Sequence, residues 1–177
     1  NRDGLRPRGA TVTLYKQIGD GDKKVVETRT LDGSDTFSNL PKCEGGKEIT
    51  YSVEQARVEH YEEPVKSTDG NNIFTNKYVP EKINIPVEKR WRNGGNNSLN
   101  CPITVQIKAN GELVKDGEDS YKEIVLDETN GYKGEFTGLY KKAGGEDITY
   151  TIVEKIVPEK YTVDYDQTNF IITNTYG

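Results

Sequence analysis

The chain has 177 residues, of which 32% are hydrophobic and 30% charged, and its mean hydropathy of -0.82 suits small domains with thin cores. The formal net charge of -5 is spread along the chain without a basic stripe, which argues against nucleic acid and an anionic membrane as partners. No apolar run resembles a membrane span or a signal peptide, so we expect a soluble segment whose targeting or anchoring sequences lie outside it.

An internal repeat organises the chain. Three pairs of segments match in the same order: 36–40 with 135–139, 45–51 with 144–150, and 74–78 with 172–176. We therefore predict two tandem domains, 1–80 and 81–177. Their join is expected near 78–87, where Pro80 and Pro86 bracket a short extended linker.

Short alternating runs rich in Val, Ile, Thr and Tyr fill both repeats, and no helical period interrupts them. In the second repeat they predict strands at 87–91, 103–107, 112–115, 120–126, 134–139, 148–153, 161–165 and 170–176. Asn110 and Gly111 predict a tight hairpin turn between two of these strands. About seven short strands per repeat favour an all-β fold of two immunoglobulin-like sandwiches over closed barrels.

The first repeat differs from the second at its start. Residues 1–7 form a polar segment that matches 92–100, and no segment of the first repeat matches 87–91. We therefore expect the first domain to lack its N-terminal strand. The open sheet edge could be filled by an upstream segment, by a neighbouring molecule or by solvent.

Lys89, Glu154 and Asn174 lie at strand positions that face the core, because each has apolar neighbours two residues away on the same face. A buried charge left alone is costly, so these three residues, the trio, are expected either to meet or to react. A buried salt bridge with an Asn hydrogen bond is one alternative. A lysine that extends to the rim of the domain is another.

The residue types of the trio permit amide formation. Burial lowers the pKa of a lysine and raises that of a glutamate, so Lys89 would become a nucleophile and Glu154 a carboxylic acid. That acid could hydrogen-bond to the carbonyl oxygen of Asn174 and shuttle the proton with which ammonia leaves. The apolar shell expected to exclude water consists of Trp91, Tyr150 and Phe170.

Three segments resemble the signature strands of Cna B-type repeats: Val-Glu-Lys-Arg-Trp at 87–91, Gly-Glu-Asp-Ile-Thr-Tyr-Thr-Ile-Val-Glu at 145–154, and Phe-Ile-Ile-Thr-Asn-Thr-Tyr at 170–176. Such repeats are stalk domains of collagen adhesins, pilins and related wall-anchored proteins of Gram-positive bacteria. The resemblance spans the second repeat and most of the first. It implies a spontaneous isopeptide bond between Lys89 and Asn174, with Glu154 as the acid and without a cofactor.

The resemblance also implies a function and a location. The expected function is that of a structural stalk or spacer, outside the cell, in a protein whose wall anchor lies beyond this segment. Its expected partners are neighbouring repeats, with a host extracellular-matrix protein bound through another region. A module that binds a ligand or a strand is the alternative, whereas a turnover enzyme is not expected, since the trio would react only once.

The first repeat departs from the pattern at the acid position, which is occupied by Gln55, while Asn76 keeps the acceptor position. A glutamine side chain cannot donate a proton as a carboxylic acid does. The lysine would belong to the strand that this repeat lacks. We therefore predict no isopeptide bond within the first domain, although a lysine-bearing strand from elsewhere could dock there.

Cys43 and Cys101 are too far apart in sequence for a metal-binding pair, and a single histidine cannot complete a familiar zinc set. No metal is expected. The two cysteines are interpreted either as isolated thiols or as a disulfide, and the sequence leaves both open.

Overall fold

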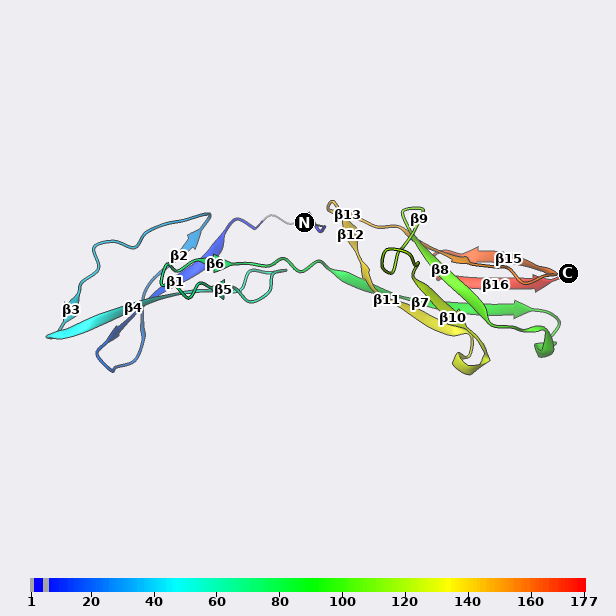
Figure 1. Cartoon of the computed structure of the whole chain (residues 1–177), viewed down its shortest axis with the longest axis horizontal. Helices are drawn as coiled ribbons and strands as arrows, with labels where there is room; N and C mark the ends of the chain where they lie inside the picture. The colour runs from blue at the N-terminus through cyan, green and yellow to red at the C-terminus, as the bar shows by residue number, and fades with distance from the viewer. Residues whose placement is uncertain (1, 5–6) are drawn as a thin grey trace. The chain divides into compact units, whose positions relative to one another are not determined.

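The computed structural model describes residues 2–4 and 7–177, and its regular structure is almost entirely β-strand (Figure 1). The described chain divides into unit 1, Asp3–Pro80, and unit 2, Glu81–Gly177. Within the described residues, no helix has the length and apolar character needed to cross a membrane. The prediction of an all-β fold is confirmed.

The strands of unit 1 are β1 (Ala10–Ile18), β2 (Lys24–Leu31), β3 (Cys43–Glu44), β4 (Lys47–Gln55), β5 (Val65–Lys66) and β6 (Phe74–Thr75). The strands of unit 2 are β7 (Lys82–Arg92), β8 (Ile103–Ala109), β9 (Glu112–Leu113), β10 (Glu123–Leu126), β11 (Lys133–Tyr140), β12 (Lys142–Ala143), β13 (Glu146–Asp147), β14 (Tyr150–Glu154), β15 (Tyr161–Asp166) and β16 (Ile171–Tyr176). Short 3₁₀ helices lie at Asn97–Leu99 and Glu128–Asn130.

Unit 2 is a sandwich of two sheets. One sheet has the strand order β11-β7-β16-β15, and the other has the order β10-β8-β14 with β9 also paired to β8. β7 and β16 run parallel, whereas the other pairs in these sheets are antiparallel. Apolar residues of both sheets form one buried core, which includes Val87, Val105, Ile107, Ile152 and Ile172.

β7 is longer than predicted, because it begins at Lys82 and takes in the segment that the sequence suggested was a linker. Pro86 lies within the strand, opposite Glu135 of β11. The N–H of Glu88 points toward the β16 side, where it donates to Phe170 O, and residue 86 faces the same way. β16 pairs with β7 only from Glu88 onward, so no strand lies opposite the backbone nitrogen of Pro86. The missing N–H of the proline therefore costs no hydrogen bond between strands.

The predicted hairpin at Asn110 and Gly111 is confirmed. Both residues have positive φ, 49° and 88°, as a tight turn between β8 and β9 requires. Other predicted ends shift by a few residues: β10 begins at Glu123 and not at 120, and β14 begins at Tyr150 and not at 148.

In unit 1, the described strands form the sheet β2-β1-β4-β3 and the separate pair β5-β6. Residues 32–42, where the counterpart of β11 would fall, carry no strand. Among the described residues of this unit, the buried apolar side chains are Val12, Leu14 and Ile49. One face of the main sheet is therefore less fully covered than either sheet of unit 2.

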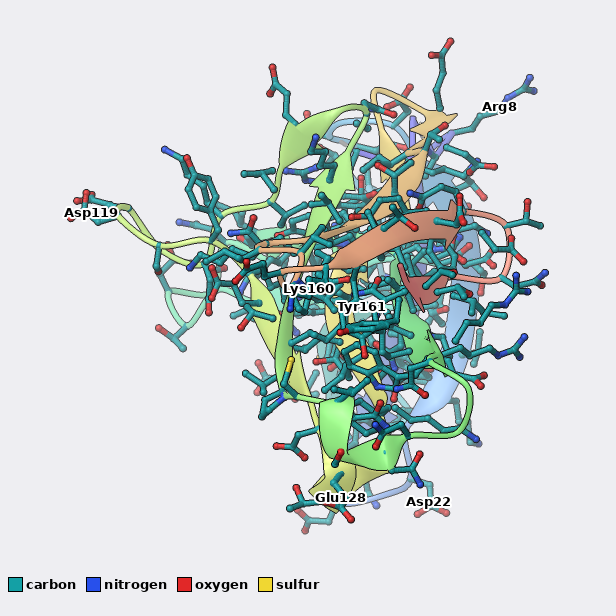
Figure 2. All side chains as sticks on the ribbon, turned by 90° about the vertical axis from the view of Figure 1, so that its right-hand side faces the viewer. Arg8, Asp22, Asp119, Glu128, Lys160 and Tyr161 are labelled. Carbon is teal, nitrogen blue, oxygen red and sulfur yellow. The ribbon has the colours of Figure 1, made fainter. Side chains whose placement is uncertain are left out.

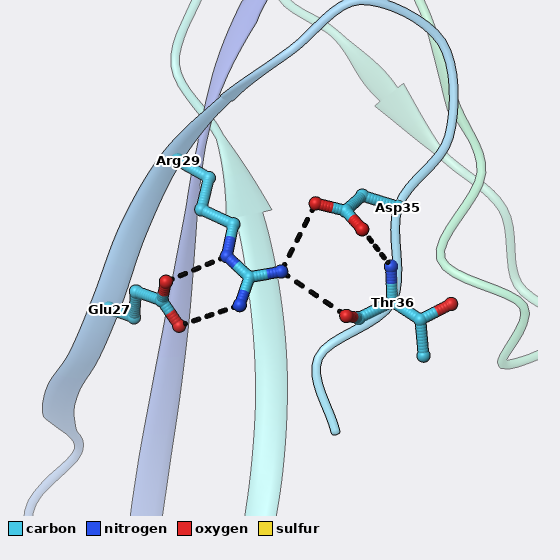
Figure 3. A network of polar contacts seen from close by, with 4 residues as sticks. All are labelled: Glu27, Arg29, Asp35 and Thr36. Atoms are coloured by element: carbon cyan, nitrogen blue, oxygen red, sulfur yellow. Dashed lines mark hydrogen bonds and ion pairs between the residues drawn. The ribbon is translucent and has the colours of Figure 1, made fainter.

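A polar network holds the segment that follows β2 (Figure 3). Arg29 donates to both carboxylate oxygens of Glu27, at 2.7 and 3.0 Å, and to Asp35 Oδ2 at 3.1 Å and Thr36 O at 3.2 Å. Its guanidinium also lies 4.2 Å from the centre of the Phe37 ring. Side-chain contacts thus take the place that strand pairing has in unit 2.

A cavity of about 740 Å³ lies in unit 1 between the main sheet and the segments that surround it. Its walls include Leu14 and Val53 of the sheet, Phe37 of the segment after β2, and Gln55 and Asn76. The cavity is mainly apolar near the sheet and polar where Gln55 and Asn76 face each other.

Candidate functional site

Three strands of unit 2 bring the trio together. Lys89 lies on β7, Glu154 ends β14 and Asn174 lies on β16, with exposed fractions of 4%, 4% and 0%. In the parallel pairing of β7 with β16, Lys89 is opposite Ile172 and Asn174 is opposite Trp91. Lys89 and Asn174 are therefore diagonal neighbours in one sheet, and Glu154 approaches them from the other sheet.

The Glu154 carboxyl lies between the Lys89 amine and the NH₂ of the Asn174 amide. Lys89 Nζ is 3.6 Å from Glu154 Oε2, and Asn174 Nδ2 donates a hydrogen bond to Glu154 Oε1 at 3.0 Å. Asn174 Oδ1 accepts no hydrogen bond from any described residue. The sequence suggested that the acid would bond to this carbonyl oxygen, whereas here it bonds to the amino group of the same amide.

Burial acts on the two ionisable groups of the site in opposite directions. It lowers the pKa of Lys89 to about 8, although the nearby Glu154 carboxylate opposes the change. It raises the pKa of Glu154, against the opposing effects of the Lys89 charge and the Asn174 hydrogen bond. Both shifts favour the neutral amine and the neutral carboxylic acid over the ion pair.

Trp91 covers the amine. Lys89 Nζ lies 4.0 Å from the centre of the Trp91 ring, and this ring packs edge-on against Tyr132 at 5.7 Å and Tyr161 at 5.0 Å. In Figure 2, Tyr161 lies among neighbouring side chains, whereas Asp119 and Glu128 project outward. This aromatic group places Trp91 where the predicted apolar shell required it.

Tyr150 begins β14 and Phe170 lies in the turn just before β16, so both are farther from the trio along the chain than Trp91 is, although both pack in the core of unit 2. Each is four residues from its trio member, which corresponds to roughly 13 Å along a strand. The hydroxyl of Tyr150 donates to Tyr140 O at 2.5 Å, and Phe170 acts through its carbonyl oxygen, which accepts from Glu88 N at 3.1 Å.

The apolar residues nearest to the trio along the strands are Val87, Ile152 and Ile172, together with Val105, which is opposite Glu154 in the β8–β14 pairing. All four are at most 2% exposed. The sequence already indicated the neighbours two residues away, Val87, Ile152 and Ile172, since residues two apart in a strand share a face. Val105 lies on a different strand, so only the pairing of β8 with β14 shows that it is near Glu154.

Two aromatic residues with left-handed backbone hold the strand that carries the lysine. Tyr132 has φ of 56° and Phe170 has φ of 54°, which is unusual for bulky residues. Tyr132 O accepts from Lys89 N at 2.8 Å, and Phe170 O accepts from Glu88 N. Strained residues that persist are held by the surrounding structure and cluster at functional sites. The sequence carries no signal for them.

The corresponding positions of unit 1 hold a different pair. Gln55 is opposite Val12 in the β1–β4 pairing, as Glu154 is opposite Val105 in unit 2. Gln55 Nε2 donates to Asn76 Oδ1 at 2.5 Å, and Asn76 Nδ2 donates to Gln55 Oε1 at 3.3 Å. The two side-chain amides thus hydrogen-bond to each other, and the pair contains neither a carboxylic acid nor an amine that could form an isopeptide bond.

Both cysteines carry free thiols in the structure. Cys43 is exposed in β3 of unit 1, and Cys101 is half-buried just before β8 of unit 2. A disulfide between them would join the two units, and it stays a prediction from the sequence.

Comparison with known proteins places the chain in a family. The model of the Cna protein B-type domain matches residues 1–77 and 85–175. The chain belongs to this family. Both matched segments are Cna B-type domains, so the predicted tandem of immunoglobulin-like sandwiches is confirmed at the level of the family. The resemblance stated from the three strand motifs is also confirmed.

The relatives are bacterial surface adhesins. The Cna B-type chain is 34% identical over 185 residues to the collagen adhesin of Staphylococcus aureus, covering 99% of the chain and 14% of that adhesin. Among solved structures, it resembles a single B repeat unit of the S. aureus collagen-binding surface protein Cna, with 29% identity, a TM-score of 0.49, and coverage of 99% and 91% of the two chains. The pilus adhesin SpaC of Lactobacillus rhamnosus GG is 14% identical with a TM-score of 0.40, over 95% of this chain and 25% of SpaC.

Proposed function

We propose that the chain is a pair of stalk repeats of a Gram-positive surface adhesin or pilin, and that unit 2 is locked by an isopeptide bond between Lys89 and Asn174. One observation carries the proposal: the Glu154 carboxyl directs one oxygen to the lysine amine and the other to the Asn174 amino group, in a fully buried site. Family membership supports the structural role.

The geometry supports a proton shuttle through the carboxyl. The neutral Lys89 Nζ attacks Asn174 Cγ, and the Nζ–Cγ bond forms as the Cγ–Nδ2 bond breaks. Glu154 Oε2 takes the proton that Nζ gives up, and Oε1 delivers a proton to Nδ2, which leaves as ammonia. An amine and a carboxamide become one secondary amide and one ammonia, and the carboxyl returns to its protonated state.

The surroundings favour this reaction over hydrolysis. Ile152, Ile172 and the Trp91 ring cover the site and exclude bulk water. Water therefore does not compete with the Lys89 amine for the Asn174 amide carbon. The product also replaces the Lys89 amine, which could become a costly buried charge by protonation, with a neutral amide. The groups are consumed once, which is self-processing and not enzymatic turnover.

The bond would join the strands through which tension passes. β7 opens unit 2 and β16 closes it, and they lie side by side in parallel (Figure 1). Pulling on the two ends of the unit shears this pair, and a covalent bond across it carries the load past the core. A spacer that holds a binding region away from a wall needs this resistance.

We place the protein outside the cell, anchored through a region beyond this segment, with neighbouring repeats as partners and a host matrix protein bound elsewhere.

Intact mass of the denatured chain tests the proposal. The chain is expected to weigh one ammonia less than its sequence, and Glu154→Ala or Lys89→Ala is expected to restore the full mass. Asn76→Ala in unit 1 is the matched control, and it should keep the deficit of one ammonia. A wild-type chain of full mass, with both units folded, would remove the isopeptide bond from the proposal.

The cavity of unit 1 favours strand binding as a second candidate function. In unit 2, β7 presents Val87 and Lys89 to the core beside Glu154 and Asn174. The fitting occupant of the unit 1 cavity is thus an extended segment patterned like β7, with apolar side chains toward Leu14 and a polar one toward Gln55 and Asn76.

A peptide with the sequence of residues 82–92 is the probe for this candidate. Saturable, non-covalent binding to the whole chain is expected, weakened by Leu14→Asp in the cavity and unchanged by Leu113→Asp in unit 2. No adduct that survives denaturation should form, because Gln55 supplies no acid. Binding that ignores Leu14→Asp would assign the peptide to another surface and reject this candidate.

A further inference from the structure

The acid of the site sits at the end of an edge strand. β14 pairs with β8 on one side, and within unit 2, which is described throughout, no strand pairs with its other side. Glu154 is the last residue of β14. Strand ends and unpaired edges are where pairing is most easily lost, so something else must fix a residue whose two oxygens are aimed at two partners.

Two side chains take the place of the absent neighbouring strand. Glu154 N donates to the hydroxyl of Tyr165 at 2.9 Å. Gln167 bonds twice to Ile152: its Oε1 accepts from Ile152 N at 2.8 Å, and its Nε2 donates to Ile152 O at 2.9 Å. A glutamine amide has one donor side and one acceptor side, so it mimics a peptide group of a paired strand.

We infer that Tyr165 and Gln167 are positioning residues for Glu154, which couple the acid strand to the acceptor strand during isopeptide formation. Tyr165 lies on β15 and Gln167 follows it, both on the side of the sandwich that carries Asn174. Tyr165 is opposite Ile172 in the β15–β16 pairing, two residues from Asn174. The contacts that hold β14 therefore come from the hairpin whose other strand presents the reacting amide.

The inference rests on the proposed isopeptide bond and assigns no chemical step to either residue. Their hydrogen bonds go to the backbone of β14 and not to the reacting atoms. Their effect is on the distances from Glu154 to the two amino groups, and reactions of this kind lose rate steeply when a group is displaced by about 1 Å.

The test uses two variants that keep side-chain volume and remove only the hydrogen-bonding groups, Tyr165→Phe and Gln167→Met. The chain is collected unfolded in denaturant, diluted to start folding, and the loss of ammonia is followed by intact mass. Each variant is expected to form the bond about tenfold or more slowly than wild type. Tyr121→Phe, an exposed tyrosine of the same unit, is the matched control and should react at the wild-type rate.

A second measurement separates positioning from general weakening. Each substitution is repeated with Glu154→Ala, which prevents the bond, and the unfolding midpoint shows whether unit 2 is folded. Slow bond formation in variants that fold, with a rate that depends on pH as it does in the wild type, supports positioning, because Glu154 remains the acid. Wild-type rates in both variants would overturn the inference and leave the isopeptide bond intact. A wild-type chain that loses no ammonia would overturn both, and the two failures are thus distinct.

Discussion

Lys89 and Glu154 share the cost of burial by exchanging one proton. Because burial lowers the pKa of Lys89 to about 8 and raises that of Glu154, the ion pair and the neutral pair lie closer in free energy than they would in water. Only the neutral pair contains both a nucleophilic amine and an acid that can protonate the leaving group. The proposed reaction would thus need no outside reagent, only the exclusion of water.

The rate of isopeptide formation is expected to depend on pH with a maximum. Below the pKa of Glu154 both groups carry protons and the ammonium cannot attack. Above about 8 the amine is neutral but the pair has lost the proton that the leaving group needs, so the rate should fall about tenfold per pH unit. Mass measured at intervals after dilution from denaturant gives the profile. A rate that climbs steadily through this range would show that amine deprotonation alone is limiting.

Glu154→Gln separates the effect of the carboxylic acid proton from the effect of side-chain packing. The glutamine oxygen can still accept from Asn174 Nδ2 and the side-chain volume is kept, so unit 2 should fold, but without a carboxylic acid no bond should form. The expected result is full sequence mass with the native circular-dichroism spectrum. Glu112→Gln, the same change at an exposed position of β9, is the matched control and should keep the deficit. A deficit in Glu154→Gln would mean that another group moves the proton.

The sequence predicted the meeting of the trio because strand parity fixes which side chains face inward. It could not predict how the Asn174 amide is turned, since rotation about a side-chain bond leaves no pattern in the chain. Tyr165 and Gln167 were also out of reach, because their partners are backbone groups of another sheet. Because nearly every residue has the same backbone N–H and C=O groups, the sequence does not mark which of these groups bind a side chain.

At the scale of the elements, β7 is the strand that links the core of unit 2 to the candidate site. It pairs with β11 on one side and β16 on the other, and its inward residues belong to both the core and the site. The sequence misplaced its start because Pro86 was interpreted as a break. A proline is tolerated where its missing N–H faces no strand, and that condition depends on where β16 begins, which is a property of the folded sheet.

Gly134 tests how closely the two sheets approach. It lies on β11 opposite Val87, and a Cβ added there would be 2.8 Å from Leu126 Cδ2 and 3.2 Å from Ile124 Cδ1. Leu126 is fully buried and cannot move aside freely, so Gly134→Ala should destabilise unit 2 by about 1 to 3 kcal/mol.

Denaturant unfolding in the Glu154→Gln background measures this effect without the cross-link. Glu135→Ala, the adjacent exposed position of β11, is the control and should change stability by less than about 0.5 kcal/mol. Equal effects of the two substitutions would show that β10 and β11 pack less closely than the structure has them.

At the scale of the molecule, the two units have different means of stabilisation. The described part of unit 1 buries few apolar residues and carries an amide pair where unit 2 carries the trio. In unit 2, the proposed bond from Lys89 to Asn174 would close a loop of about 85 residues and reduce the entropy of the unfolded chain, a free-energy gain of about 4 to 5 kcal/mol at room temperature. That gain is comparable to the whole stability of many small domains.

Extension of the single molecule under force distinguishes a welded unit 2 from an ordinary sandwich. When the chain is pulled from its two ends, the residues between Lys89 and Asn174 lie inside the closed loop and cannot extend, so wild type should gain only the length of unit 1 and the short flanks. Breaking the loop with Glu154→Ala should add about 290 Å of contour length, from about 85 residues at 3.3 to 3.6 Å each. Asn76→Ala should leave the wild-type length unchanged, because it alters unit 1 alone. An identical total length for wild type and Glu154→Ala would mean that no covalent bond spans β7 and β16, whatever the closeness of the three side chains.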